Sequence, residues 1–117
     1  MVPIRPKGTS VVLNTEMPAI AYLLDALSLM ARDPSLVLPR ELVITSGNDS
    51  QHSPNSRHYR YEAIDIRSQN FPTLASKRAF RARYEQVLGE RFRVLLEGVG
   101  TPNEHFHAQV RMGQVFP

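Results

Sequence analysis

The 117-residue chain contains no cysteine. Without thiols it cannot form a disulfide bond, a cysteine nucleophile, a zinc ribbon or an iron–sulfur cluster. Histidine, aspartate and glutamate are therefore the strong candidate ligands for any metal, and the chain has four histidines and 11 acidic residues to supply them. Any metal site in this protein would use nitrogen and oxygen donors only.

The chain also lacks the apolar segments that direct proteins to membranes. Residues 1–10 contain two basic residues with no apolar run behind them, and the apolar stretch Ala19–Leu24 is followed at once by Asp25. Neither segment has the length and hydropathy of a signal peptide or a transmembrane helix. We therefore expect no signal peptide, no membrane insertion and synthesis in the cytoplasm.

The composition has neither the low hydropathy nor the high charge of a disordered chain, with 42% hydrophobic and 21% charged residues. A chain of this length can form one compact domain but not two independent cores, so residues 1–117 are expected to form a single domain. The formal net charge of +3, carried mainly by arginine, is compatible with an anionic partner. Nucleic acid, a cell-wall polymer and no specific partner all stay open at this point.

Periodicity and turn residues predict two helices and four strands. The expected helices are Pro18–Arg32 and Thr73–Leu88, and the expected strands are Leu42–Thr45, Ala63–Ile66, Phe92–Glu97 and His105–Arg111. This order fits an α+β fold in which a small, mostly antiparallel sheet packs against two helices. One face of the sheet would then be free to carry a site.

Proline and glycine mark the ends of these elements. The N-terminal residues 1–10 contain two prolines and a glycine, which predict an extended arm rather than a helix. Asn14 or Thr15 is the expected N-cap of the first helix, and Gly89 is the expected C-terminal stop of the second.

Residues with catalytic potential gather before the second expected strand and around the last one. His105 and His107 alternate along the last strand, so both side chains should point to the same face of the sheet. If Asp65 lies on that face, then His58, Asp65 and His107 can converge. Two imidazoles and one carboxylate leave a fourth position open, as a catalytic zinc site requires.

Glu104 directly precedes the last strand, in a turn where strand alternation does not fix its direction. It could therefore lie beside the metal and act as a general base. The spacing alone does not separate this site from ordinary surface residues, because such intervals recur by chance. A loop histidine, a turn carboxylate and a half-exposed pair of strand histidines would show the same pattern.

The residues around His58 and Asp65 resemble a known signature. The segment Ser56–Ile66 reads Ser-Arg-His-Tyr-Arg-Tyr-Glu-Ala-Ile-Asp-Ile. It is similar to the Ser-x-His-x-x-Gly-x-Ala-x-Asp motif of the M15-type D-alanyl-D-alanine metallopeptidases and their hedgehog-like relatives. Val43–Gly47 is similar to the strand and turn that precede this motif, and Glu104–His107 to the family's Glu-x-x-His and His-x-His motifs. The three blocks keep the family's order and span roughly residues 42 to 111.

This resemblance implies a small antiparallel sheet flanked by helices and one Zn²⁺ per chain, bound by His58, Asp65 and His107. It implies that Glu104 is the catalytic base and that His105 stabilises the oxyanion or binds the substrate. The family acts on peptides of bacterial cell walls. The expected function is therefore zinc-dependent hydrolysis of peptidoglycan stem peptides, as a DD-carboxypeptidase or an endopeptidase. A short, arginine-rich enzyme of this kind suits a phage or prophage lysis module that acts at the cell wall.

Two departures from the family pattern concern the loop that would face the substrate. Tyr61 stands where the family usually has glycine, and Asn48 and Asp49 follow Gly47 where many members have an aromatic residue and an arginine. We expect the loop 48–59 to form one wall of the substrate groove, with its own specificity. The candidate substrate-binding residues are His52, Ser56, Arg57 and Arg60, each of which would also be ordinary as a solvated polar side chain.

Three further features leave alternatives open. Glu97, at the end of a strand, could orient a ligand histidine or simply be exposed. Tyr61 and the altered loop favour a non-catalytic module of the same fold that binds metal and serves in wall binding or phage structure. The basic face of the second helix motivates a metal-dependent nuclease, but no phosphate-cradling loop accompanies it, so nucleic acid is not the expected partner. The sequence does not specify the oligomeric state, the scissile bond or which divalent metal binds.

Overall fold

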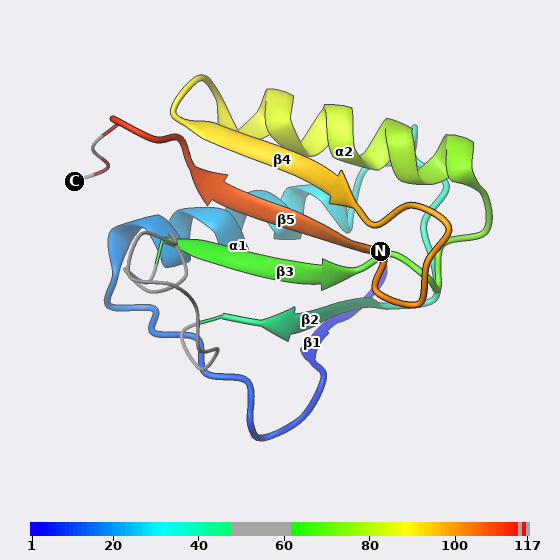
Figure 1. Ribbon diagram of the computed structural model, residues 1–117, viewed down its shortest axis with the longest axis horizontal. Coiled ribbons are helices and arrows are strands. Elements are labelled where there is room, and N and C mark those ends of the chain that lie inside the picture. The colour runs from blue at the N-terminus through cyan, green and yellow to red at the C-terminus, as the bar shows by residue number, and fades with distance from the viewer. Residues whose placement is uncertain (48–61, 115, 117) are drawn as a thin grey trace.

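A computed structural model describes residues 1–47, 62–114 and 116 of the chain. Its elements, in chain order, are β1 (Ile4–Pro6), α1 (Pro18–Met30), β2 (Leu42–Ser46), β3 (Ala63–Arg67), α2 (Leu74–Leu88), β4 (Phe92–Glu97) and β5 (His105–Val110) (Figure 1). Both expected helices and all four expected strands are present, with ends that differ by no more than two residues from those expected. The strand β1 was not among the expected strands.

The strands form one five-stranded sheet in the order β1-β2-β3-β5-β4. β1 runs parallel to β2, and the other three neighbouring pairs are antiparallel. The α+β prediction is therefore confirmed, with a mixed sheet of which most pairings are antiparallel. This order places β3, which carries Asp65, next to β5, which carries His105 and His107, in the interior of the sheet.

Within the expected extended N-terminal arm, Ile4–Pro6 pairs with β2 as an edge strand. The Lys7 N–H donates to the Ile44 carbonyl at 2.8 Å, and the Leu42 N–H donates to the Pro3 carbonyl at 2.9 Å. Proline is tolerated on an edge strand because a nitrogen that faces away from the neighbouring strand needs no proton there. The two prolines therefore do not prevent this short pairing.

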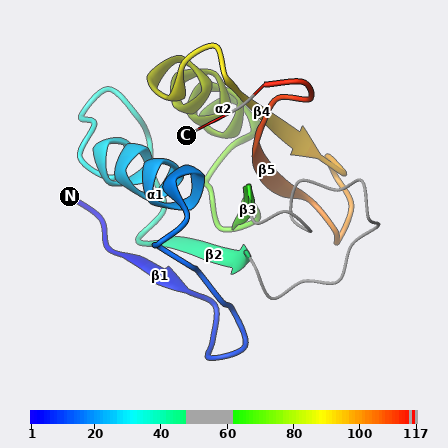
Figure 2. The ribbon, with the colours of Figure 1, turned by 90° about the vertical axis from the view of Figure 1, so that its left-hand side faces the viewer.

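Both helices pack on the same face of the sheet (Figure 2). Buried apolar side chains from the helices and the strands form one core there; the largest fully buried ones include Ile20, Leu23, Phe80, Tyr84, Phe92 and Phe106. The Tyr84 hydroxyl donates to the Leu23 carbonyl at 2.7 Å and so links the two helices. Complete burial raises the pKa of Tyr84, which remains a neutral donor. Among the described residues, no helix covers the opposite face of the sheet.

The helix ends differ from expectation at one of the two caps. The N-cap of α1 is Met17, with no side-chain hydrogen bond, and Asn14 instead accepts the Glu16 N–H at 3.1 Å in the preceding turn. The expected cap at Asn14 or Thr15 was therefore wrong, since Asn14 closes a local turn of its own. Gly89 ends α2 with a φ of 90°, as expected. Neither helix of the described residues has the length and apolar character needed to span a membrane.

Candidate functional site

The last strand divides its side chains between the two faces of the sheet. His105, His107 and Gln109 lie on the open face, whereas the three residues that alternate with them are fully buried in the core. This confirms the predicted orientation of the two histidines. The strand register places Asp65 opposite His107 on β3 and Glu97 opposite His105 on β4. We call Asp65, Glu97, His105 and His107 the open-face cluster.

His107 and Asp65 are in direct contact across neighbouring strands. Nδ1 of His107 lies 2.8 Å from Oδ1 of Asp65, and Nε2 lies 2.7 Å from Oε1 of Gln109. Burial by itself lowers the pKa of His107, but the hydrogen bond and the negative charge of Asp65 outweigh it, so the net shift is upward. The structure thus brings together two of the three predicted metal ligands on the predicted face.

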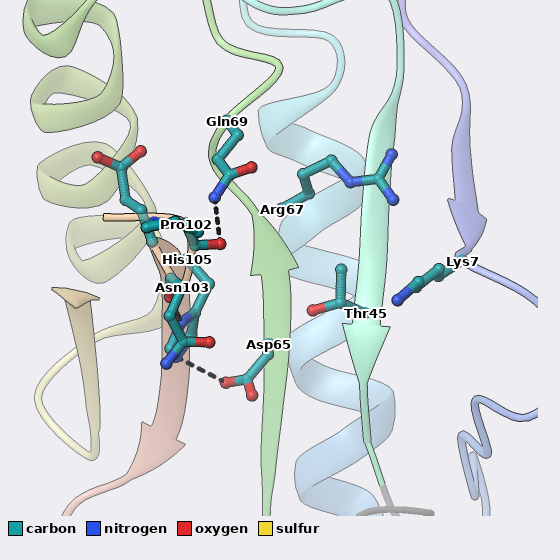
Figure 3. Close-up of a pocket in the computed structure, with 9 residues that line it drawn as sticks. Lys7, Thr45, Asp65, Arg67, Gln69, Pro102, Asn103 and His105 are labelled. Carbon is teal, nitrogen blue, oxygen red and sulfur yellow. Dashed lines mark hydrogen bonds and ion pairs between the residues drawn. The ribbon is translucent and has the colours of Figure 1, made fainter. Parts of the chain in front are cut away.

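His105 links Asp65 to Glu97. Its Nε2 lies 3.1 Å from Oε1 of Glu97 and 4.0 Å from Oδ1 of Asp65, and the second contact is visible in Figure 3. Its Nδ1 lies 2.7 Å from the Asn103 carbonyl oxygen. The Asn103 carbonyl and the Glu97 carboxylate together contact both ring nitrogens and so fix the orientation of the His105 ring.

The donor chemistry of Asp65 and His107 fits a divalent metal. One imidazole nitrogen and one carboxylate oxygen, 2.8 Å apart, are of the kinds that zinc binds together. Within the described ranges, however, no group of three or more His, Cys, Asp or Glu side chains is arranged to hold a metal ion. The predicted third ligand, His58, lies outside the residues that the structure describes.

The substrate-facing loop also lies outside the described residues. This applies to the expected groove wall 48–59, to Tyr61, and to all four predicted substrate-binding residues, His52, Ser56, Arg57 and Arg60. Their predicted roles therefore stay predictions.

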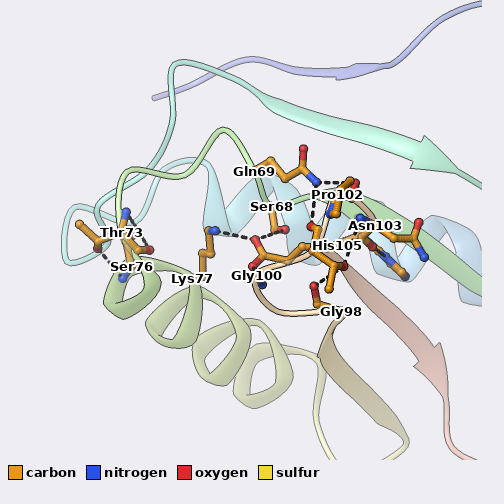
Figure 4. Close-up of polar contacts among 12 residues, drawn as sticks. Ser68, Gln69, Thr73, Ser76, Lys77, Gly98, Gly100, Pro102, Asn103 and His105 are labelled. Atoms are coloured by element: carbon orange, nitrogen blue, oxygen red, sulfur yellow. Dashed lines mark hydrogen bonds and ion pairs between the residues drawn. The ribbon is translucent and has the colours of Figure 1, made fainter.

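The side chain of Glu104 lies on the helix side of the sheet, with surroundings that the sequence analysis did not anticipate. Its Oε1 accepts hydrogen bonds from Lys77 Nζ at 2.5 Å and Ser68 Oγ at 2.7 Å, and its Oε2 accepts the Gly100 N–H at 3.1 Å (Figure 4). The residue is only 7% exposed. We call Glu104, Lys77, Ser68 and Gly100 the Glu104 network.

These contacts give Glu104 a structural role in the fold. The Lys77 ammonium, helped by Ser68 and Gly100, outweighs burial and lowers the pKa of Glu104 to about 2. The Glu104 carboxylate thereby ties the β4–β5 turn to α2 and to Ser68, just beyond β3. That Glu104 is the catalytic base beside a metal stays a prediction.

Glu97, one of whose two expected roles was to orient a histidine, lies against His105 in the structure. Its side chain is 46% exposed and contacts His105 from the last position of β4. The sequence contained a signal for this contact. Two consecutive expected strands joined by the turn 98–104 form a hairpin, and a hairpin places the residues that flank its turn, Glu97 and His105, opposite each other.

Comparisons with known proteins do not assign the chain to a family. No protein-family model matches it, and no curated protein matches it. The similarity in motifs described above is therefore the basis of the functional proposal that follows.

Proposed function

We propose that this protein is a zinc-dependent peptidase that hydrolyses peptide bonds in the stem peptides of bacterial peptidoglycan. The observation that carries the proposal is the 2.8 Å contact between Asp65 Oδ1 and His107 Nδ1 on the open face of the sheet. Next to it lie a second histidine and an exposed carboxylate, His105 and Glu97. The wall-peptide substrate is proposed from the motif similarity alone.

In this proposal Asp65 and His107 hold the metal together with His58. A bound zinc ion supplies Lewis-acid chemistry, since it polarises a carbonyl group and lowers the pKa of water to about 7. Asp65 is held in place by its position in the sheet, between the neighbouring strands β2 and β5. His107 is supported by Gln109, whose side-chain oxygen meets its second ring nitrogen.

Glu97 is proposed as the general base in place of Glu104. It is the acidic side chain of the cluster that is not already placed as a ligand, and its partial exposure leaves room for water beside it. Its carboxylate takes a proton from the attacking water and returns it to the nitrogen of the leaving amine, so that the carboxylate is regenerated. The His105 ring orients the Glu97 carboxylate through their 3.1 Å contact.

A second candidate is a non-catalytic module of the same fold. Both ring nitrogens of His107 already have protein partners, Asp65 and Gln109, so the open-face cluster is hydrogen-bonded without a metal. Such a module would bind wall peptides and leave them intact. Hydrolysis therefore decides between the two candidates.

The test is release of alanine from an N-acetylated stem pentapeptide and of peptides from purified peptidoglycan, with zinc supplied and with zinc removed by a chelator. We expect hydrolysis that depends on zinc and that is abolished in His107→Ala. Glu90→Gln is the matched control, because Glu90 is an exposed carboxylate with no polar contact among the described residues, and it should keep full activity. Absence of hydrolysis by zinc-loaded wild type on both substrates would favour the non-catalytic module.

A further inference from the structure

An open groove leads away from the open-face cluster. Its volume is about 340 Å³. It is lined by Lys7, Thr45, Asp65, Arg67, Gln69 and the segment 102–105 (Figure 3). At one side lie Asp65 and His105 of the cluster. From there the groove extends over β2 to the end of β1, where Lys7 follows the strand.

Two cationic side chains line the far part of this groove. Figure 3 shows Arg67 reaching from β3 across β2, and Lys7 reaching toward Thr45 from beyond β1. In the part of the chain that the structure describes, neither side chain forms a hydrogen bond or an ion pair. Other arginines are paired: Arg5 contacts Glu41 at 2.7 Å, and Arg83 contacts Asp33 at 3.1 Å.

The carboxylates that line the groove do not neutralise these two cations. Asp65 is 2.8 Å from His107, and Glu104 is in the ion pair with Lys77. Asp65 and Glu104 are therefore each paired with a basic side chain other than Arg67 or Lys7. Among the residues that the structure describes, the positive charge at the β1–β2 end of the groove is not balanced, which favours an anionic group on a peptide that lies there.

The separation between Asp65 and Arg67 suits the binding of a substrate carboxylate by Arg67. Arg67 is two residues from Asp65 along β3, a separation of about 7 Å in an extended strand. An extended peptide covers about 3.5 Å per residue, so this separation corresponds to about two residues of substrate. A guanidinium group can bind a carboxylate through two parallel hydrogen bonds, and the Lys7 ammonium adds a second positive charge.

We propose that Arg67 and Lys7 form a subsite for the free C-terminal carboxylate of the peptide substrate, one or two residues beyond the bond that is cleaved. This proposal rests on the proposed peptidase function and makes it more specific. Of the two expected activities it selects the carboxypeptidase, because an endopeptidase substrate has no free carboxylate at that position.

The test compares one peptide with and without its terminal charge. Binding of N-acetyl-L-lysyl-D-alanyl-D-alanine and of its C-terminal amide is measured by NMR titration of the full chain, in the Glu97→Gln background so that the acid is not consumed. We expect the acid to bind about tenfold more tightly than the amide, because only the acid offers the guanidinium a charged partner for its hydrogen bonds. Arg67→Gln should bring the acid to the affinity of the amide, and Lys7→Gln should lower the preference in part.

Two further variants control for charge and for folding. Arg78→Gln removes the same charge from the exposed surface of α2 and should keep the preference for the acid. Arg67→Lys keeps a charge at the site and should keep part of the preference. Equal binding of acid and amide by the parent protein would overturn the subsite, as would an unchanged preference in folded Arg67→Gln.

The peptidase proposal can fail separately from the subsite. A preference for the acid in a protein that never hydrolyses peptides with zinc bound would support the subsite and remove the peptidase. Hydrolysis without that preference would support the peptidase and overturn the subsite.

Discussion

Glu97 and Glu104 are two carboxylates at opposite ends of one turn, and they face opposite sides of the sheet. Glu104 is buried and accepts three hydrogen bonds from Lys77, Ser68 and Gly100. Glu97 is 46% exposed and contacts His105. A buried carboxylate that accepts three hydrogen bonds stabilises the fold, whereas a half-exposed carboxylate beside a histidine has room for water next to it.

The Glu104 network also explains how the open-face cluster keeps its position. The turn that it ties down, residues 98–104, ends immediately before His105, and Gln69 donates from the end of β3 to the Pro102 carbonyl at 2.6 Å. Gly100 supplies its N–H to Glu104 from a backbone with a φ of 80°, a conformation that favours glycine. Contacts on the helix-covered face of the sheet thereby fix the turn 98–104, and this turn leads directly into His105 on the open face.

The largest expected difference between the two residues is catalytic. Glu97→Gln removes the proposed base with little change in size, and we expect hydrolysis of the stem peptide to fall by about 10²–10⁴-fold, the range for loss of a general base. Zinc content and the urea midpoint of unfolding should stay at wild-type values. Initial rates of alanine release measure the effect, and a Glu97→Gln enzyme of normal activity would remove Glu97 from the mechanism.

Glu104→Gln should act on stability instead. It leaves Lys77, whose side chain is 16% exposed, without its carboxylate, and breaking a buried ion pair from one side costs about 3–5 kcal/mol. We expect urea denaturation to show a loss near the lower end of this range. At temperatures where the variant is folded, hydrolysis per folded molecule should remain near wild type.

The double variant Glu104→Gln with Lys77→Met is the control for this prediction. It removes both charges together, so its loss of stability should be smaller than the sum of the two single losses. Additive losses would show that the two side chains do not act as a pair.

Stability should also depend on pH through Glu104. Its pKa in the folded protein is about 2, against an ordinary value of 4.5, so the unfolded chain takes up the proton first as pH falls. The stabilisation is complete above about pH 4.5 and is lost as pH falls from there toward 2. The free energy of unfolding of wild type should therefore fall more steeply in this window than that of Glu104→Gln. Parallel curves for the two proteins would contradict this assignment.

The smallest expected effect concerns the helix that carries Lys77. Thr73 caps α2 by accepting the Ser76 N–H at 3.0 Å, and Ser76 Oγ accepts the Thr73 N–H at 3.1 Å. Thr73→Ala should destabilise the protein by about 1 kcal/mol, typical of losing an N-cap, without changing zinc content. Thermal unfolding measures this loss, and a wild-type midpoint would show that the cap contributes nothing.

The open-face cluster and the Glu104 network differ in how far the sequence could predict them. The orientation of His105 and His107 follows from strand alternation, and their pairing with Asp65 needed only the strand order to be known. The direction of Glu104 could not be predicted, because its partner Lys77 is 27 residues away and reaches it only once α2 is packed on the sheet. The β1 strand was missed because its prolines argue against a strand unless its edge position is known.

Whether His107 binds a zinc ion is tested by the zinc content of three purified, folded proteins. These are wild type, His107→Ala and His105→Ala. His105 lies on the same strand face as His107 and is not a proposed ligand, so its variant is the matched control. The account predicts one tightly bound zinc per chain in wild type and in His105→Ala, and none in His107→Ala. No zinc in wild type, or equal zinc in wild type and His107→Ala, would contradict it.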